Sequence, residues 1–262
     1  MGLTHQSCGS GVRKENFFKG SPGKTQYRIA LAGNPNTGKS TLFNALTGLN
    51  QHTGNWPGKT VLRAEGKYIH AGRVFSLVDL PGTYSLLANS PEEQVARDYL
   101  CFSKPDATVV VVDATCLERN LNLVLQVLEM TPKVVVCVNL MDEAKRKKIN
   151  VDIQRLSTEL GVPAVATTAR QGHGLDTLVT VIADIASGRL QTSPYVVQYS
   201  ARLEEAVARI EPHIKELIGE DFNSRWLSLR ILEQDQTIIN ALEQWLAKVM
   251  YVEANLGGEL RA

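Results

Sequence analysis

Eight consecutive residues, Gly33 to Ser40, have the spacing of a phosphate-binding loop. Their order, Gly-Asn-Pro-Asn-Thr-Gly-Lys-Ser, matches the pattern G-x-x-x-x-G-K-[ST]. In such a loop the backbone N–H groups converge on phosphate oxygens, and glycine permits that close approach because it has no Cβ. Lys39 would place a positive charge on the β- and γ-phosphates, and the Ser40 hydroxyl would bind Mg²⁺. The nucleotide contacts that we expect here come from Gly33, Asn34, Asn36, Thr37, Gly38, Lys39, Ser40 and Thr41.

The residues around this loop have the pattern of a strand before it and a helix after it. An apolar run, Tyr27–Ala32, leads in, and a helical pattern, Thr41–Leu46, leads out. Further β-branched runs alternate with helix-like segments as far as Gly188, at 61–69, 73–78, 107–112, 133–138 and 162–166. This alternation predicts an α/β fold, with a mostly parallel six-stranded sheet, helices on both faces and the phosphate loop after the first strand.

The sequence changes character after Gly188. The stretch 188–194 is polar and turn-forming, and the short Tyr195–Tyr199 segment is the last strand-like run. Apolar residues then recur at helical spacing, at Leu203, Val207, Ile210, Ile214 and Leu217, and again at Ile238, Leu242, Trp245 and Val249. We expect a domain boundary here, followed by a small all-helical domain.

Composition limits the classes of protein to which the chain can belong. With 262 residues, 21% charged residues and a net charge of +1, it lacks the basic excess that favours nucleic acid. Four cysteines without C-x-x-C spacing favour a reducing cytoplasm. The longest apolar runs, such as 134–138, are far shorter than the ~18 residues of a membrane span, and the first residues form no secretory signal. We therefore expect a soluble chain in which the polar residues 1–26 form a flexible arm without a defined metal site.

A carboxylate and a glycine follow the run at 73–78 with the spacing Asp-Leu-Pro-Gly. They lie about 40 residues after the phosphate loop, at a strand end, where open α/β sheets bind ligands. We expect Asp79 to orient Mg²⁺ and the Gly82 amide to meet the γ-phosphate.

The stretch between these motifs, residues 51–60, contains glycine and proline and is predicted to be a loop rather than a packed element. Such a loop closes on the γ-phosphate and relaxes after hydrolysis. Thr60 is the candidate whose hydroxyl joins Mg²⁺ in the triphosphate state. His52 and Trp56 are expected to have loop or packing roles rather than catalytic ones.

Base recognition is predicted for the tetrapeptide Asn139-Leu-Met-Asp142. The Asp142 carboxylate can accept hydrogen bonds from N1–H and the 2-amino group of guanine, a pair that adenine does not offer. Leu140 stands where the usual N-K-x-D motif has a lysine, so we expect weaker nucleotide binding and faster GDP release. Further along, Thr168 and Ala169 match a loop whose backbone contacts the guanine carbonyl.

In this order the motifs resemble the cytoplasmic N-terminal part of FeoB, a family of bacterial ferrous-iron transporters. The patterns G-N-W-x-G-x-T and D-A-T-x-L-E-R-N-L distinguish that family from other GTPases. The matching stretches are Leu31–Ser40, Gly54–Thr60, Asp79–Ser85, Val111–Leu121, Asn139–Asp142 and Arg225–Arg230. The resemblance implies a Ras-like P-loop GTPase domain, here 27–190, and a helical domain that stabilises bound GDP, here 195–255, followed by a tail at 256–262.

The resemblance also implies where such a chain acts. In this family the two domains precede a polytopic membrane domain that passes Fe²⁺. We therefore expect a fragment that works at the cytoplasmic face of the bacterial inner membrane, with GTP or GDP as ligand, that membrane domain as partner and no nucleic acid. A homo-oligomer stays open.

Thr83 occupies the position at which many GTPases have a glutamine that orients the attacking water. Related GTPases without that glutamine use K⁺ as a fixed positive charge, held by a phosphate-loop asparagine, and Asn36 matches that position. The resemblance thus implies GTP hydrolysis with Mg²⁺ and K⁺, in which Asn36, Lys39, Thr60 and Gly82 act on the phosphates. The arginines expected to be solvated surface charges rather than catalytic fingers are Arg63, Arg73 and Arg97.

Two alternatives remain at this point. One is a soluble GTPase similar to Era or TrmE, acting in ribosome assembly or tRNA modification, although the C-terminal region has no KH-type G-x-x-G pattern and no basic stripe. The other is a nucleotide-binding scaffold without useful catalysis, which the missing glutamine permits.

Overall fold

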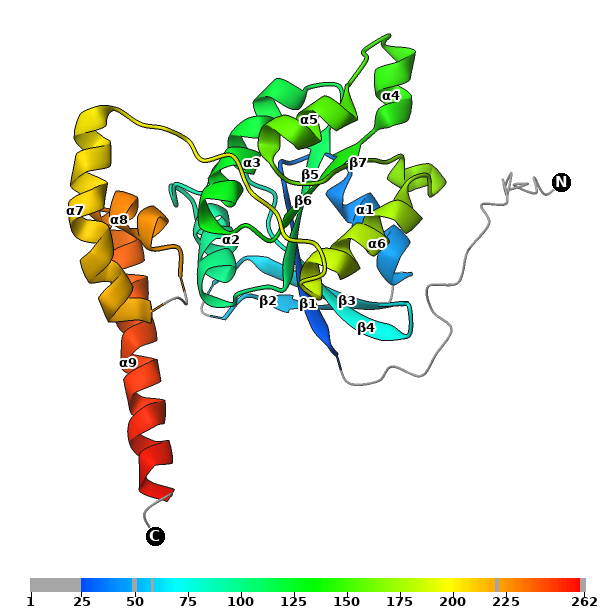
Figure 1. Cartoon of the computed structure of the whole chain (residues 1–262). Coiled ribbons are helices and arrows are strands. Elements are labelled where there is room, and N and C mark those ends of the chain that lie inside the picture. The colour runs from blue at the N-terminus through cyan, green and yellow to red at the C-terminus, as the bar shows by residue number, and fades with distance from the viewer. Residues whose placement is uncertain (1–24, 49–50, 58, 220–221, 260–262) are drawn as a thin grey trace, which may run out of the picture.

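The computed structural model describes residues 25–48, 51–57, 59–219 and 222–259, and a mixed sheet lies at its centre. Within these residues the sheet has the strand order β2-β3-β4-β1-β5-β6-β7 (Figure 1). The strands are β1 Tyr27–Gly33, β2 Gln51–Asn55, β3 Leu62–His70, β4 Arg73–Asp79, β5 Ala107–Asp113, β6 Val134–Asn139 and β7 Ala164–Ala166. The β4-β1-β5-β6-β7 pairs are parallel, and the β2-β3 and β3-β4 pairs are antiparallel. The α/β class predicted from the alternation is confirmed.

Strand β2 was not predicted, and the described sheet therefore has seven strands instead of six. The stretch that was expected to be a loop pairs with β3 from Gln51↔Gly66 to Asn55↔Leu62. Its side chains are polar or absent, so no apolar alternation marks it. Backbone hydrogen bonds along the free edge of β3 are sufficient to form an edge strand, because ladder pairing does not need a buried face.

Helices cover both faces of the sheet (Figure 1). The helices that follow β1, β4 and β5 are α1 Lys39–Thr47, α2 Pro91–Phe102 and α3 Leu117–Met130. Later in the chain come α4 Met141–Arg146, α5 Ile153–Leu160, the 3₁₀ turn η1 Ala169–Gln171 and α6 Leu175–Ala186. Alternate residues of β1 enter different cores: Ile29 and Leu31 pack with α1 and α6, and Ala30 and Ala32 pack with α2 and α3. This division follows from the two-residue period of a strand. The carboxyl ends of the parallel strands are left at one edge.

Three further helices form the C-terminal part: α7 Ala201–Ile218, α8 Ser224–Leu232 and α9 Gln236–Glu259. The segment before α7 has no regular secondary structure, so the interpretation of Tyr195–Tyr199 as strand-like was wrong. Its alternating apolar residues are largely exposed, and the Tyr195 N–H donates to Leu160 O (2.9 Å) at the end of α5 instead of joining the sheet. Apolar pattern alone did not distinguish an extended connection from a strand.

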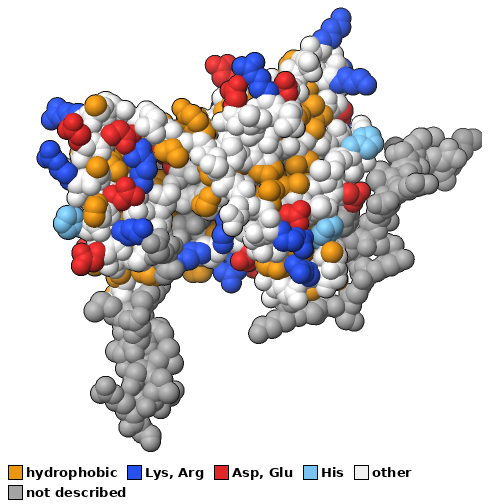
Figure 2. Space-filling model, viewed as in Figure 1, with side chains coloured by type: hydrophobic (Ala, Val, Ile, Leu, Met, Phe, Trp, Pro, Cys, Tyr) orange, Lys and Arg blue, Asp and Glu red, His pale blue; other side chains and the backbone are white. Residues whose placement is uncertain are grey.

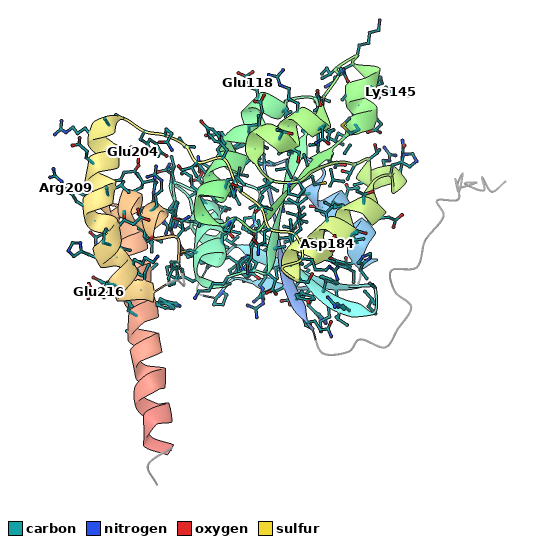
Figure 3. All side chains as sticks on the ribbon, viewed as in Figure 1. Glu118, Lys145, Asp184, Glu204, Arg209 and Glu216 are labelled. Atoms are coloured by element: carbon teal, nitrogen blue, oxygen red, sulfur yellow. The ribbon has the colours of Figure 1, made fainter. Side chains whose placement is uncertain are left out.

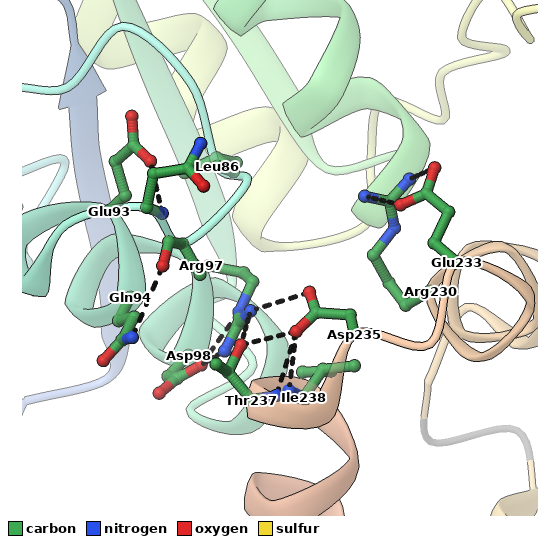
Figure 4. Close-up of polar contacts among 12 residues, drawn as sticks. Leu86, Glu93, Gln94, Arg97, Asp98, Arg230, Glu233, Asp235, Thr237 and Ile238 are labelled. Atoms are coloured by element: carbon green, nitrogen blue, oxygen red, sulfur yellow. Dashed lines mark hydrogen bonds and ion pairs between the residues drawn. The ribbon is translucent and has the colours of Figure 1, made fainter.

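Arg97 joins the two parts of the chain, and its prediction as a solvated charge was wrong. It lies on α2 with 1% of its surface exposed. Its guanidinium donates to Asp98 Oδ1 (2.8 Å), to Asp235 Oδ2 (3.2 Å) and to Thr237 Oγ1 (2.8 Å), as Figure 4 shows. Partners near the start of α9 supply the counter-charge that makes this burial tolerable. The other two arginines predicted to be exposed are half-buried and stack over aromatic rings.

The surface carries mixed charge. On the face drawn in Figure 2, basic and acidic side chains alternate over the C-terminal helices and the sheet domain. Arg209 and Glu216 both come from α7, and Glu118 and Lys145 lie at the end of the molecule where β5 and β6 finish (Figure 3). Among the described helices, none is long and apolar enough to cross a membrane.

Candidate functional site

The phosphate loop connects β1 to α1 at the carboxyl edge of the sheet, as predicted. Gly38 has a left-handed backbone (φ 82), and a Cβ there would lie 2.3 Å from Asn139 Nδ2. A Cβ on Gly33 would lie 2.6 Å from Val111 O at the end of β5. Both glycines are therefore required by close approach of neighbouring strands, and the loop is held against the ends of β5 and β6.

Lys39 and Asp79, predicted to serve phosphate and Mg²⁺, are brought into direct contact. The Lys39 ammonium donates to Asp79 Oδ1 and to Leu80 O, the latter at 2.6 Å. Burial raises the pKa of the Asp79 carboxyl above its ordinary value, although the adjacent lysine charge opposes that shift. The cation of the phosphate loop and the carboxylate of the D-x-x-G motif neutralise one another. Ser40, the other predicted Mg²⁺ ligand of the loop, is exposed on the first turn of α1.

The D-x-x-G segment runs beside the phosphate loop. The Leu80 N–H donates to Leu31 O (3.0 Å), and the Thr83 N–H donates to Gly33 O (3.3 Å). Gly82 is exposed, and a Cβ on it would lie 3.4 Å from Pro35 N. The structure therefore places the Gly82 amide, predicted to meet the γ-phosphate, next to the loop that would hold that phosphate.

The chain beyond Thr83 is held by side chains of α3. The Arg119 guanidinium lies over the Tyr84 ring at 4.3 Å, and Gln126 Oε1 accepts from the Leu86 N–H at 2.6 Å. The sequence motif at Asp79–Ser85 did not predict these partners. Its partners come from one face of α3, because residues seven apart on a helix lie on the same side.

The base side of the site is tied together by Asn139. Its Nδ2 donates to Thr37 O (3.0 Å), and its Oδ1 accepts from the Ala169 N–H (3.0 Å) and from Thr167 Oγ1 (3.1 Å). All four residues are buried. The amide of Asn139 thus links the phosphate loop to the loop after β7, a structural role that its predicted contact with nucleotide did not include.

Asp142 and Leu140 lie at the start of α4. In the described part of the chain, the buried Asp142 Oδ1 has no hydrogen-bond partner, so an acceptor is available for a base. Leu140 has a left-handed backbone (φ 62), and its Cδ2 lies 3.8 Å from where a Gly38 Cβ would stand. The side chain that replaces the usual lysine therefore still covers the phosphate loop. Thr168, also buried, donates its N–H to His173 O (3.0 Å).

Two phosphate-loop asparagines differ in their surroundings. Asn36 is exposed and has φ 66, whereas Asn34 is buried. Neither Asn34 Oδ1 nor Asn34 Nδ2 has a hydrogen-bond partner among the described residues. Because the Asn34 side chain is buried, the contact predicted between Asn34 and nucleotide would come from its backbone. Thr41, predicted to contact nucleotide as well, is exposed on α1.

The segment that follows β2 carries Trp56 and Thr60. Trp56 is buried, packs edge-on against Tyr99 with ring centroids 5.3 Å apart, and donates Nε1–H to Leu62 O (3.1 Å). Its predicted packing role is confirmed. His52 and Thr60 are exposed. None of the contacts recorded for the described residues joins Thr60 to the phosphate loop, so its role as a Mg²⁺ ligand stays a prediction.

Comparison with known proteins places both parts of the chain in one group. The family model for ferrous iron transport protein B matches residues 27–182, and that for the FeoB cytosolic helical domain matches residues 199–260. A fusion of Fe(2+) transport protein A and Fe(2+) transporter FeoB from Porphyromonas gingivalis is 39% identical over 213 residues, which are 80% of this chain and 25% of that protein. The chain thus spans about a quarter of the length of the curated relatives that it matches.

Solved structures of nucleotide-bound relatives are also similar. The cytosolic domain of the T. maritima FeoB iron transporter in GDP form I has a TM-score of 0.76 and 36% identity, covering 84% of this chain and 86% of that one. The GMPPNP form of the same domain has a TM-score of 0.75 and 34% identity, covering 83% and 86%.

Proposed function

Because the chain belongs to the ferrous iron transport protein B family, we propose that it binds and hydrolyses GTP as the cytoplasmic regulatory domain of a ferrous-iron membrane transporter. One observation carries the nucleotide part: the side chain of Asn139 joins the phosphate loop to the base loop, so both ends of a bound nucleotide would meet a single connected frame. The GDP and GMPPNP forms of the T. maritima relative support the choice of ligand.

Guanine specificity is assigned to Asp142. A buried carboxylate oxygen without a partner costs free energy, and N1–H and the 2-amino group of guanine are donors that would remove that cost. The backbone of Thr168 and Ala169 borders the same place. Replacement of Asp142 by Asn gives a donor where the acceptor was, and should move the preference from GTP to XTP, whose base has a 2-oxo group in place of the amine.

The residues that we propose as Mg²⁺ ligands are Ser40, Asp79 and Thr60, whose side chains carry hard oxygen donors of the kind that this ion prefers. When bound, Mg²⁺ neutralises charge on the β- and γ-phosphates. When nucleotide binds, the Lys39 ammonium would exchange its hydrogen-bond partners. This ammonium, now on Asp79 and Leu80 O, would turn to the phosphates and leave the carboxylate available.

Catalysis would proceed without a glutamine, because the residue after Asp-Leu-Pro-Gly is Thr83. We assign the positioning of the attacking water to backbone groups around Gly82, with Lys39 on the phosphates. Asn36 and carbonyls of the 54–60 loop would hold K⁺, and the exposed Asn36 side chain has an amide oxygen suitable for it. K⁺ supplies a fixed positive charge where negative charge develops.

The GTPase rate in K⁺ and in Na⁺ tests this proposal. We expect turnover that is faster in K⁺ by about tenfold or more, and loss of that difference in Asn36→Ala. A chain that binds GDP and GMPPNP but has no turnover in either salt would be the non-catalytic scaffold. Both parts of the chain match the transporter family, which disfavours the soluble Era-like alternative.

The transporter role involves a membrane domain, which would lie in the roughly three quarters of the relatives that this chain does not match. We infer a polytopic membrane domain of the same polypeptide as the partner of residues 27–190 and 195–255, and a position at the cytoplasmic face of the inner membrane. Fractionation of the full-length protein with membranes, and ferrous-iron uptake that Asp142→Asn impairs when GTP is supplied, would support it. Uptake independent of guanine nucleotide would contradict it.

A further inference from the structure

The side chain of Asn34 is buried inside the phosphate loop, without a hydrogen-bond partner in the part of the chain that the structure describes. It is 2% exposed, and both of its polar atoms are unpaired among the described residues. Most buried side-chain polar atoms in proteins are hydrogen-bonded, because burial without a partner costs free energy. An amide with both ends unpaired beside a nucleotide site indicates a partner that is in place in another state of the protein.

The main chain of Gly82 and Thr83 lies against the two residues that flank Asn34. Thr83 N–H donates to the carbonyl of Gly33, the residue before Asn34, and Gly82 lies against Pro35, the residue after it. The D-x-x-G segment therefore meets the phosphate loop at the residues on either side of Asn34. A peptide unit offers one N–H and one C=O, which match the acceptor and donor ends of an asparagine amide.

Two backbone hydrogen bonds join the D-x-x-G segment to the phosphate loop region, and they differ in length. The bond from Leu80 N–H to Leu31 O is 3.0 Å, an ordinary length. The bond from Thr83 N–H to Gly33 O is 3.3 Å, beyond the common range of such bonds. The bond at Thr83 is therefore the longer of the two, and it is the one that would be exchanged when a γ-phosphate attracts the Gly82 amide.

We propose that Asn34 is a positioning residue whose amide bonds the Gly82–Thr83 main chain only in the GTP state, and so holds the backbone groups that orient the attacking water. The inference rests on the proposed GTPase function. It also separates the roles of the two asparagines of the loop: Asn36 is exposed and is the proposed K⁺ ligand, whereas Asn34 is buried and would act through the neighbouring D-x-x-G segment. GDP lacks the γ-phosphate that draws this segment in, so GDP binding does not use the contact.

The test compares two nucleotides in an Asn34→Leu variant of the 262-residue chain, since leucine has a similar size and no hydrogen-bonding atoms. We expect the affinity for GMPPNP and the kcat for GTP each to fall about tenfold, with the affinity for GDP changed by less than about twofold. The ratio of rates in K⁺ and Na⁺ stays at the wild-type value, unlike in Asn36→Ala. The thermal midpoint of the nucleotide-free protein is unchanged or higher, because the unpaired amide is gone.

Three results would overturn the proposal. Equal losses of GDP and GMPPNP affinity would mean that Asn34 only maintains the loop or holds a water in both states. Wild-type discrimination and kcat in Asn34→Leu would mean that the amide is not used. If leucine prevents folding, the smaller Asn34→Ala variant serves in its place. A lower thermal midpoint of that variant, together with a wild-type ratio of GMPPNP to GDP affinity, would show that Asn34 has a purely structural role. If the wild-type chain does not hydrolyse GTP, the proposed function fails, while the GMPPNP-to-GDP ratio still tests Asn34.

Discussion

The base end and the phosphate end of the nucleotide site differ in how far their hydrogen bonds are already formed without a ligand. At the base end, the Asn139 amide makes three hydrogen bonds that join the phosphate loop to the loop after β7. At the phosphate end, Lys39 is bonded to Asp79, neither polar atom of the Asn34 side chain has a partner in the described part of the chain, and the Thr83 N–H bond to Gly33 O is long. The base end is assembled without a ligand, whereas the phosphate end has internal bonds that a triphosphate must replace.

This difference has a thermodynamic consequence. A ligand shifts a conformational equilibrium only by the difference in its affinity for the two states. Groups that are already in place, such as those around Asn139, bind GDP and GTP alike. The distinction between the nucleotides must therefore come from Lys39, Asn34 and the Gly82–Thr83 peptide, where partners are exchanged.

The largest effect is expected from Lys39→Ala, which removes the only charge that the phosphate loop itself supplies. The turnover of GTP should fall by about 10²–10³-fold, because the charge that develops on the phosphates loses its compensation. The variant also leaves Asp79 buried without its cation, which raises the pKa of that carboxyl further. Steady-state GTPase assays measure this, with Lys67→Ala on the exposed side of β3 as a control that should retain the wild-type rate. Near-normal turnover in Lys39→Ala would contradict the role of Lys39 at the phosphate end of the site.

The next effect is expected from Asn139→Ala, which cuts the link between the two loops. GDP and GMPPNP affinities should fall together by about tenfold or more, in contrast to the selective loss in Asn34→Leu. Because the bonds are buried and exist without ligand, the thermal midpoint should also fall, by about 3 °C or more. Calorimetric titration and thermal unfolding measure the two quantities. Loss of GMPPNP affinity alone would mean that the base end is not the preassembled one.

A smaller change is expected when Leu140 becomes lysine. A long cationic side chain covering Gly38, where Leu140 now lies, would brace the base loop and add charge near the phosphates. GDP should dissociate about three- to tenfold more slowly, with kcat little changed. Stopped-flow release of a fluorescent GDP measures the rate, and Leu140→Met is the matched control, because it lengthens the side chain without charge. Equal release rates from all three proteins would contradict the expectation that Leu140 weakens nucleotide binding.

The smallest effect is expected from Arg119→Ala, which removes the cation over the Tyr84 ring. An exposed contact of this kind contributes about 0.5–1 kcal/mol. If it holds the segment in its nucleotide-free position, its loss should raise GMPPNP affinity by about two- to fivefold and leave GDP affinity unchanged. Titration with both nucleotides measures this. A parallel change in both affinities would mean that the Tyr84 contact does not distinguish GDP from GMPPNP.

Local pattern was sufficient for the main elements of the site. Gly33–Ser40 runs from the last residue of β1 into the first turn of α1 as the motif requires, because a strand, a tight loop and a helix are each set by residues close together in the chain. Asp79 and Asp142 reach the same edge of the sheet because the carboxyl ends of parallel strands meet there. The helical part after Gly188 also followed from its 3.6-residue period.

Partners remote in sequence were decided by tertiary structure. Arg97 is buried because Asp235 and Thr237, 138 and 140 residues away, reach it across the two parts of the chain. Strand β2 exists because β3 offers a free edge, and Tyr195–Tyr199 is no strand because the chain there meets the end of α5. The isolation of Asn34 and the pairing of Lys39 with Asp79 depend in the same way on which backbone passes beside each side chain. The sequence by itself determined the class of fold, the order of the motifs and the chemistry that each residue type can perform. Burial, and with it the free energy of each polar group, was decided only when distant segments packed together.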